Sequence, residues 1–130
     1  MTDAMIGTVT AGFYSAYHSS SINKDYVAAF EKANANTRPN FLTVSAYDGM
    51  HLIYEALKKT GGKTAGDALI TAMKGMSWES PRGPISIDPE TRDVVHNIYL
   101  RKVEKIAGRL YNVEFATSES VKDPLKTAAK

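Results

Sequence analysis

The chain has 130 residues, of which 43% are hydrophobic and 23% are charged. This balance indicates one folded domain with a core, and it excludes a disordered chain. The net charge of +2 is too small to favour binding to nucleic acid or to an anionic membrane surface. The absence of cysteine excludes a disulfide framework, a thiol nucleophile and a cysteine-ligated metal site.

The first five residues lack the basic segment and the apolar stretch of a signal peptide. We expect residues 1–5 to be a leader or a remnant of another segment. No apolar run approaches the roughly 20 residues that span a bilayer. Two interpretations of the compartment stay open: the protein remains in the cytoplasm, or a signal peptide was removed before this chain begins.

A strand and a helix are the first elements expected along the chain. The β-branched stretch at residues 6–11 predicts the strand. The serines at 19–21 indicate a loop, Asn23 is a plausible N-cap, and apolar residues at helical spacing predict a helix from Lys24. This helix should fray and be over by Arg38, because a residue that precedes proline avoids the α region.

A longer helix is expected over residues 41–60. Apolar residues recur there at intervals of three and four, Asn40 can cap the start, and Gly61 with Gly62 can end the helix in a left-handed conformation. The composition of residues 41–44 also allows a strand, followed by a helix capped by Ser45. The longer helical period favours the single helix.

A third helix and a β-rich region complete the pattern. Thr64 is placed to cap this helix, with Asp67 as the reciprocal capping-box residue, and apolar residues continue at helical spacing to Met76. Residues 80–84 cannot continue a helix, because they contain two prolines and a glycine. The remaining segments predict a short strand at 85–87, a turn at 88–93, an antiparallel hairpin of 94–104 and 109–116, and a fraying tail at 117–130.

No pattern of residues predicts catalysis or a metal site. His18, His51 and His96 are isolated from one another, and His51 with Glu55 has the spacing of a surface pair on a helix. The carboxylates at 88–93 lack the spacing of a calcium loop, and no phosphate-binding or nucleophile motif is present. We therefore expect no enzymatic activity and no cofactor.

An aromatic cluster directly after the first expected strand is the best candidate for a binding site. Phe13, Tyr14 and Tyr17 lie there beside His18. Ligand sites in α/β proteins gather at the carboxyl ends of strands, and rings with a polar tip suit small organic solutes. Ordinary core or hinge packing of two of these rings is an equally good interpretation.

A series of short segments also occurs in a characteristic order between Ile6 and Pro124. The segments are GFYS (12–15), NKDYVAAF (23–30), AYDG (46–49), EALKK (55–59), SPRGPI (80–85), DPETRD (88–93), NIY (97–99), KV (102–103) and DP (123–124). No one of them is specific. Their order resembles the C-terminal third of type I periplasmic solute-binding proteins of ABC transporters, in the branched-chain amino acid (Leu/Ile/Val-binding) class.

Members of that family have two α/β lobes joined by three crossover segments, and they close on a solute between the lobes. The resemblance implies that residues 6–116 form part of one lobe, an α/β fragment with three amphipathic helices followed by a C-terminal β-hairpin. It implies a non-enzymatic periplasmic protein whose partners are a small-molecule solute, a membrane permease and the missing N-terminal lobe. The solute would be a branched-chain amino acid or another small organic acid, aromatic acids included. A ligand-sensing domain of a receptor or regulator with the same fold is the alternative.

The same resemblance points to ligand-binding positions. The residues that match pocket or hinge positions are Phe13, Tyr14, Tyr17, Phe41 and Leu42. Most pocket residues of the family lie in the missing portion, so we expect no complete site in this chain. Three apolar helical stripes would pack on a missing sheet, and we therefore expect the chain to self-associate. The stripes are Tyr26, Val27 and Phe30; Met50, Ile53 and Leu57; and Leu69, Met73 and Met76.

Overall fold

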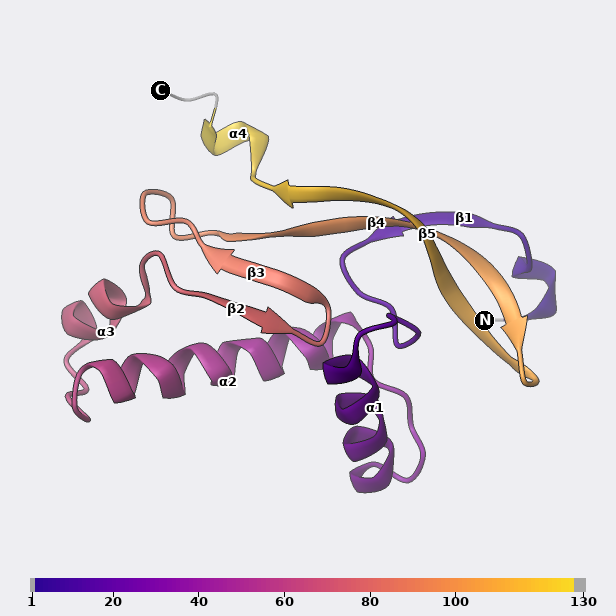
Figure 1. Cartoon of the computed structure of the whole chain (residues 1–130), viewed down its shortest axis with the longest axis horizontal. Coiled ribbons are helices and arrows are strands. Elements are labelled where there is room, and N and C mark those ends of the chain that lie inside the picture. The colour runs from indigo at the N-terminus through magenta and orange to yellow at the C-terminus, as the bar shows by residue number, and fades with distance from the viewer. Residues whose placement is uncertain (1, 128–130) are drawn as a thin grey trace.

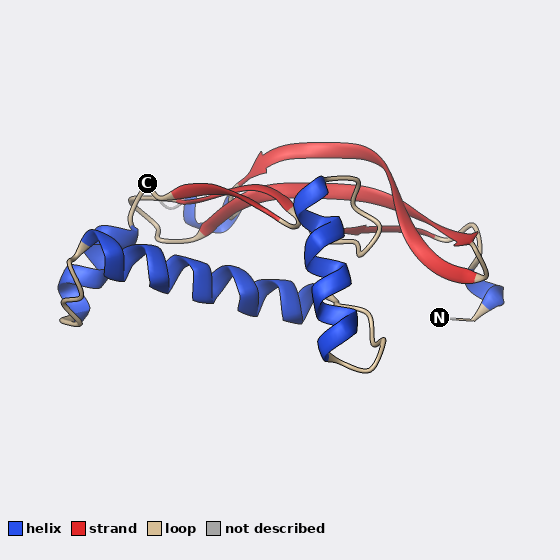
Figure 2. Cartoon of the chain, turned by 60° about the horizontal axis from the view of Figure 1, so that its bottom comes forward, coloured by secondary structure: helices blue, strands red, loops and turns tan. Residues whose placement is uncertain are grey.

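A five-stranded antiparallel sheet forms one layer, and the helices α2 and α3 run along it as a second layer, while α1 crosses the direction of α2 (Figures 1 and 2). The computed structural model describes residues 2–127. It confirms an α/β fragment in which three helices precede a C-terminal hairpin. The elements in chain order are η1 (Asp3–Met5), β1 (Val9–Gly12), α1 (Ser21–Ala33), α2 (Phe41–Lys59), α3 (Gly66–Met73), β2 (Ser77–Ser80), β3 (Gly83–Ile87), β4 (Val94–Ile106), β5 (Arg109–Val121) and α4 (Pro124–Thr127).

Strand β4 is the centre of the sheet. β5 pairs with β4 along one edge, and β3 and β1 share the other edge end to end. Ile85 of β3 lies opposite His96, and Gly12 of β1 lies opposite Tyr99. The end of β1 therefore comes beside the start of β3, although the two segments are far apart in sequence.

The β4–β5 hairpin confirms the predicted pairing but is longer than expected. Ala107 and Gly108 close it with φ angles of 49° and 80°, as a two-residue primed turn requires. β5 continues to Val121, and a helical turn follows at Pro124–Thr127. The expectation that the chain frays from residue 117 is therefore wrong for residues 117–121, because backbone pairing with β4 orders a segment of low apolar content. Residues 128–130 lie outside the described part.

Helix α2 is one continuous helix, as its apolar period predicts, and no strand forms at its start. The Asn40 side chain accepts hydrogen bonds from two backbone amides of the first turn, at 2.9 and 3.2 Å, and Thr43 completes a capping box. At the other end, Gly61 and Gly62 both have positive φ. Their amides bond back to the carbonyls of Lys58 and Leu57, which is the Schellman arrangement.

The start of α1 differs from the prediction. Ser20 is the N-cap, and its hydroxyl accepts a hydrogen bond from the Asn23 amide at 3.1 Å. The prediction of Asn23 as the cap is wrong, because the serine hydroxyl three residues earlier already accepts that amide. Asn23 is instead a buried helical residue whose side chain donates to the carbonyl of His18 at 2.9 Å.

Three further boundaries differ from the prediction. α3 begins at Gly66 after Ala65 and has no side-chain cap, so the capping box of Thr64 and Asp67 is wrong. β1 occupies Val9–Gly12 instead of residues 6–11, although Gly7 and Thr8 also exchange backbone hydrogen bonds with Val103 of β4. β2 was not predicted at all: it owes its strand conformation to pairing with β3 across a turn at Pro81 and Arg82.

Helix α2 packs its buried side against the β2–β3 hairpin. Val44, Asp48 and Ala56 are its buried residues, and the His51 ring lies 5.1 Å from the Trp78 ring. The His51 ring is therefore partly packed, and the ion pair of Glu55 is formed with Lys58 at 2.5 Å. Within the described residues, no helix combines the length and the apolar character needed to cross a membrane.

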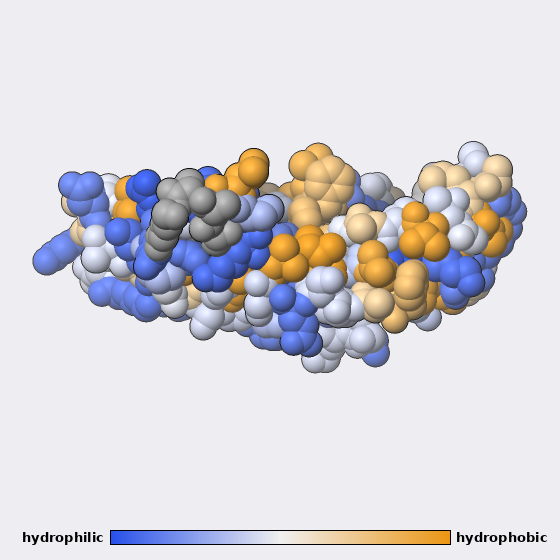
Figure 3. Space-filling model, turned by 90° about the horizontal axis from the view of Figure 1, so that it is seen from above, coloured by the Kyte–Doolittle hydropathy of each residue, from blue (hydrophilic) through white to orange (hydrophobic). Residues whose placement is uncertain are grey.

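Apolar surface remains exposed on more than one side of the molecule. Figure 3 shows separate apolar groups across the side that carries β4, β5 and β1. Six large residues of α2 are at least 40% exposed: Phe41, Leu42, Tyr47, Met50, Ile53 and Tyr54.

Candidate functional site

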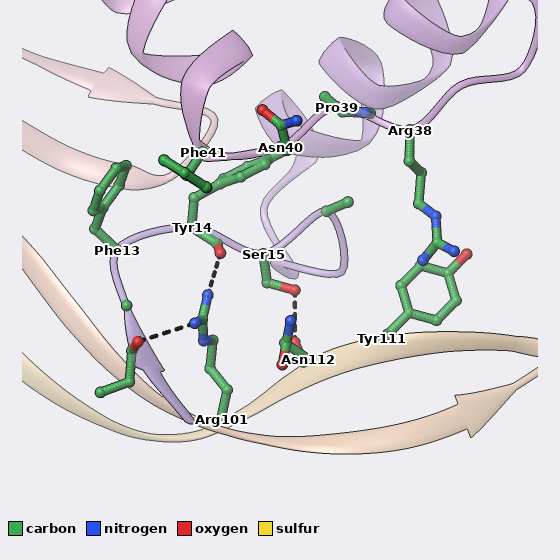
Figure 4. A pocket seen from close by; sticks show the side chains of 13 residues that line it. Phe13, Tyr14, Ser15, Arg38, Pro39, Asn40, Phe41, Arg101, Tyr111 and Asn112 are labelled. Atoms are coloured by element: carbon green, nitrogen blue, oxygen red, sulfur yellow. Dashed lines mark hydrogen bonds between the residues drawn. The ribbon is translucent and has the colours of Figure 1, made fainter. Parts of the chain in front are cut away.

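A cavity of about 610 Å³ lies where β1 ends, between the start of α2 and the strands β4 and β5 (Figure 4). Its volume falls in the range of small-molecule sites, roughly 300–1,000 Å³. The lining comes from residues 11–16, residues 38–41, and Arg101, Tyr111 and Asn112. Two arginines and several aromatic rings are among these residues, and no carboxylate is.

Arg101 reaches from β4 to the segment that follows β1 (Figure 4). One terminal nitrogen donates to the carbonyl of Ala11 at 3.1 Å, and the other donates to the carbonyl of Tyr14. Gly12 leaves room for this group, since a Cβ there would lie 2.6 Å from Nη2. Burial lowers the pKa of Arg101, but an arginine stays charged at neutral pH. Arg101 therefore holds the loop in place with a positive charge at the cavity wall.

Arg38 brings a second positive charge from the link between α1 and α2. Its guanidinium lies over the Tyr111 ring, 4.3 Å from the centroid, and Nη1 donates to the carbonyl of Leu110 at 2.7 Å. This hydrogen bond uses one of the five donors that a guanidinium carries. The planar guanidinium, with its paired N–H donors, is a group that proteins use to bind carboxylates bidentately.

Polar contacts tie the loop after β1 to β5. The Ser15 hydroxyl donates to the carbonyl of Asn112 at 2.6 Å and accepts from the amide of Tyr17 at 3.1 Å. The Thr10 hydroxyl donates to the side-chain oxygen of Asn112 at 3.1 Å. The wall of the cavity is therefore held by hydrogen bonds from β1, the loop and β5 together.

Two phenylalanines supply the apolar part of the cavity. Phe13 and Phe41 meet edge to face, with ring centroids 6.3 Å apart and planes at 90°. Phe13 is half-buried, while Phe41 is 55% exposed. This geometry is a favourable one for a ring pair, and it leaves apolar surface for a further planar group.

The structure brings three of the five expected ligand-binding residues to this cavity. Phe13 and Phe41 present their rings, whereas Tyr14 is buried, and its hydroxyl donates to Asn23 at 3.1 Å. Burial raises the pKa of the Tyr14 phenol. Contact of these residues with a solute stays a prediction.

The other two expected residues lie elsewhere. Tyr17 lines a second cavity of about 450 Å³, and its ring lies 5.0 Å from that of Tyr111. Leu42 is 64% exposed and lines neither cavity.

Arg38, Arg101 and Tyr111 line the cavity but were not predicted from the sequence. Arg38 precedes a proline and was interpreted only as the end of a helix. Arg101 and Tyr111 belong to strands, and strand periodicity does not tell which distant loop a side chain meets. The useful signal was the arginine placed two residues before the N-cap Asn40 of a long helix, near an end where anions are favoured.

Among residues 2–127, no three histidine or acidic side chains are grouped so that they could hold a metal ion. The polar side chains that line the cavity are cationic or neutral. Such a lining is suited to an organic anion, which guanidinium groups can hydrogen-bond and rings can contact.

A family model described as "Periplasmic binding protein" matches residues 2–108 of the chain. Leu/Ile/Val-binding protein homolog 6 of Brucella abortus (strain 2308) is 46% identical over 121 residues, which cover 92% of this chain and 31% of that protein. The chain therefore spans about a third of the length of this relative.

Solved structures show the same relationship. A solute binding protein of an ABC transporter from Rhodopseudomonas palustris BisB5, in complex with 3,4-dihydroxy benzoic acid, is 65% identical with a TM-score of 0.95, over 97% of this chain and 34% of that chain. A solute binding protein from R. palustris HaA2, in complex with p-hydroxybenzoic acid, is 42% identical with a TM-score of 0.83, over 91% of this chain and 32% of that chain. The chain belongs to the periplasmic binding protein family.

Proposed function

We propose that this chain is part of the extracytoplasmic solute-binding component of an ABC importer, and that its cavity forms one wall of a site for an aromatic carboxylate. The observation that carries the proposal is a single cavity that joins two arginines to aromatic rings and contains no carboxylate. Such a lining attracts an organic anion and offers flat apolar contact to its ring.

Each part of the cavity has a role in this proposal. Arg38 donates to the carboxylate of the solute, Phe13 and Phe41 contact its ring, and Arg101 holds the loop that carries Phe13. The ligands of the two Rhodopseudomonas relatives, 3,4-dihydroxy benzoic acid and p-hydroxybenzoic acid, support the choice of an aromatic acid. The absence of an acidic side chain in the lining argues against the ammonium group of an amino acid at this wall.

The rest of the protein supplies the opposite wall. β4 and β5 run through much of the length of the molecule (Figure 1), and in this proposal they lead toward a second lobe that closes on the solute by a hinge motion. The closed form then delivers the solute to a membrane permease. One wall alone buries too little of a small ligand for tight binding.

A chimera tests the proposal. This chain replaces the matching third of the BisB5 solute binding protein, and calorimetry measures binding of 3,4-dihydroxybenzoate. We expect binding by the chimera and a loss of about tenfold or more in the variant Arg38→Gln, because a charged hydrogen bond contributes about 1.5–3 kcal/mol. Arg109→Gln is the matched control, since Arg109 is exposed, contacts Glu31 at 3.1 Å and lies outside the cavity.

The isolated chain completes the experiment. It should bind no aromatic acid with a Kd below about 100 μM. A folded chimera that binds no aromatic carboxylate would overturn the proposal. Equal affinities for Arg38→Gln and Arg109→Gln would contradict the assignment of the carboxylate to Arg38, and micromolar binding by the isolated chain would contradict a one-walled site.

A further inference from the structure

Arg82 does not line the cavity, but it contacts a ring that does. Its Cζ atom lies 4.8 Å from the centroid of the Phe13 ring. The sheet register explains the contact. Gly12 lies opposite Tyr99 and Ile85 lies opposite His96, so the residue after β1 meets the β2–β3 turn along the same edge of β4.

Two separate elements, α2 and β4, hold the Arg82 side chain and backbone. Nε donates to Oδ2 of Asp48 on α2 at 2.7 Å, and Nη1 lies 2.9 Å from Nδ1 of His96 on β4. The Arg82 carbonyl accepts a hydrogen bond from the Tyr99 hydroxyl at 2.7 Å. Both side chains of the Arg82–Asp48 pair are only 6% exposed, so water competes little for these contacts.

The carboxylate that anchors Arg82 is itself anchored. Oδ1 of Asp48 accepts a hydrogen bond from the Ser80 hydroxyl at 2.7 Å, and Ser80 is fully buried. Both oxygens of Asp48 are therefore engaged, and the plane of the guanidinium is set by two elements on either side of it. A planar cation held in this way offers its flat face to a ring, which an ammonium group cannot do.

Phe13 lies between this buried cluster and the cavity. Its ring is 5.2 Å from the His96 ring and 6.3 Å from the Phe41 ring. Of these neighbours, Phe41 is a member of the cavity lining, while His96 belongs to the cluster. The Phe13 ring is therefore contacted from outside the cavity by Arg82 and His96, and from the lining by Phe41.

We infer that Arg82 is a positioning residue that holds the Phe13 ring as a flat wall and thereby selects solutes with an aromatic ring over saturated rings of the same size. The selection rests on the proposed function, whereas the holding of Phe13 does not. The variant Arg82→Lys keeps the positive charge next to Asp48 but loses the planar face of the guanidinium and its paired N–H donors. Phe13→Leu removes the ring itself and serves as the reference for complete loss of the wall.

The first measurement needs no ligand. 4-Fluorophenylalanine replaces Phe13 in the full 130-residue chain, and the ¹⁹F resonance is recorded with and without Arg82→Lys. We expect the resonance to shift or broaden in Arg82→Lys and to stay unchanged in the control Arg109→Lys. If Arg82→Lys does not fold, the variant Asp48→Asn is used instead, because it removes the carboxylate that holds the guanidinium but leaves Arg82 and Phe13 in place. It should also shift or broaden the resonance.

The second measurement is selectivity in the chimera described above. The ratio of affinities for benzoate and cyclohexanecarboxylate should fall by about three- to tenfold in Arg82→Lys, the range expected for loss of a ring contact. Phe13→Leu should lower the affinity ratio at least as far. The double variant Arg82→Lys with Phe13→Leu should have the same ratio as Phe13→Leu alone. A purely structural role would weaken both ligands equally.

The outcomes separate the two ideas. An unchanged ¹⁹F resonance in folded Arg82→Lys and Asp48→Asn chains would overturn the positioning role, as would an unchanged ratio in a chimera that binds both ligands. A shifted resonance in the 130-residue chain, together with a folded chimera that binds neither carboxylate, would overturn the proposed function while supporting the role of Arg82 in holding Phe13.

Discussion

Single residues in the aromatic cluster after β1 have two different roles. Tyr14 is buried with its hydroxyl bonded to Asn23, so its ring is core packing, whereas the neighbouring ring of Phe13 lines the cavity. The packing interpretation is thus confirmed for Tyr14, while a binding role for Phe13 stays a prediction. Behind Phe13 lies a buried ion pair between Asp48 and Arg82, whose desolvation cost is offset because the carboxylate is fully hydrogen-bonded.

At the residue scale, His96 should make stability depend on pH. Burial, and then the positive charge of Arg82, lower the pKa of His96, and Asp48 opposes this shift. The unfolded chain takes up a proton near pH 6.5 and the folded chain only at lower pH. The contribution of a neutral His96 to the free energy of unfolding is therefore fully present above about pH 6.5, and it is lost as the pH decreases from there.

Urea unfolding at pH 7.5, 6.5 and 5.5 checks this expectation. The free energy of unfolding should decrease more steeply toward low pH in the wild-type chain than in His96→Gln. The comparison uses the slope of the free energy of unfolding against pH, so a loss of stability in the variant that is equal at all three pH values does not affect the result. Identical slopes would show that His96 makes no contribution to the pH dependence.

At the scale of elements, α2 is determined largely by its own ends. Asn40 and Thr43 close a capping box at the start, and Gly61 with Gly62 ends the helix. The start of α2 also borders the cavity, since Asn40 and Phe41 belong to the lining. The same local sequence that begins the helix therefore places part of the site.

Asn40→Ala should lower the free energy of unfolding by about 1 kcal/mol, because two amides of the first turn lose their acceptor. Ser45→Ala is the control in the same turn region: its exposed hydroxyl donates only to the carbonyl of Phe41 at 2.8 Å. Denaturant unfolding followed by circular dichroism measures both. Equal effects of the two variants would contradict a capping role for Asn40.

At the scale of the whole molecule, the chain leaves a large apolar surface uncovered. Tyr47, Met50, Ile53 and Tyr54 on α2 are between 40% and 56% exposed. Each large apolar side chain left in water forgoes about 1.5–3 kcal/mol of burial. A contiguous patch of this kind is unusual on a soluble monomer.

The isolated chain should therefore self-associate through α2. Sedimentation from about 1 to 100 μM, a range of ordinary association constants, should show dimers or larger species. The double variant Met50→Glu and Ile53→Lys should shift the chain toward monomer, while Ala28→Glu with Ala29→Lys, at exposed positions of α1, should not. A monomer over the whole range would mean that the chain does not associate through this surface.

The sequence by itself determined the elements whose signals are local. The period and caps of α2, the turn at Ala107 and Gly108, and the family resemblance all follow from neighbouring residues. The aromatic cluster after β1 placed Phe13 among the candidates for the site, and the family resemblance added Phe41. Where a local signal misled, as at Asn23, a nearer hydroxyl competed for the same backbone amide.

Only the tertiary structure decided the features that depend on pairing between distant segments. β2 and the end of β5 are strands because β3 and β4 lie beside them, not because of their composition. Arg82 reaches Phe13 because the register of β4 brings β1 and β3 together along one edge. Arg101 reaches the cavity from β4 and Tyr111 from β5, which pairs with β4, and Arg38 joins them by packing on Tyr111. Strand periodicity indicates which face a side chain occupies, but it contains no information on which distant loop that face will meet.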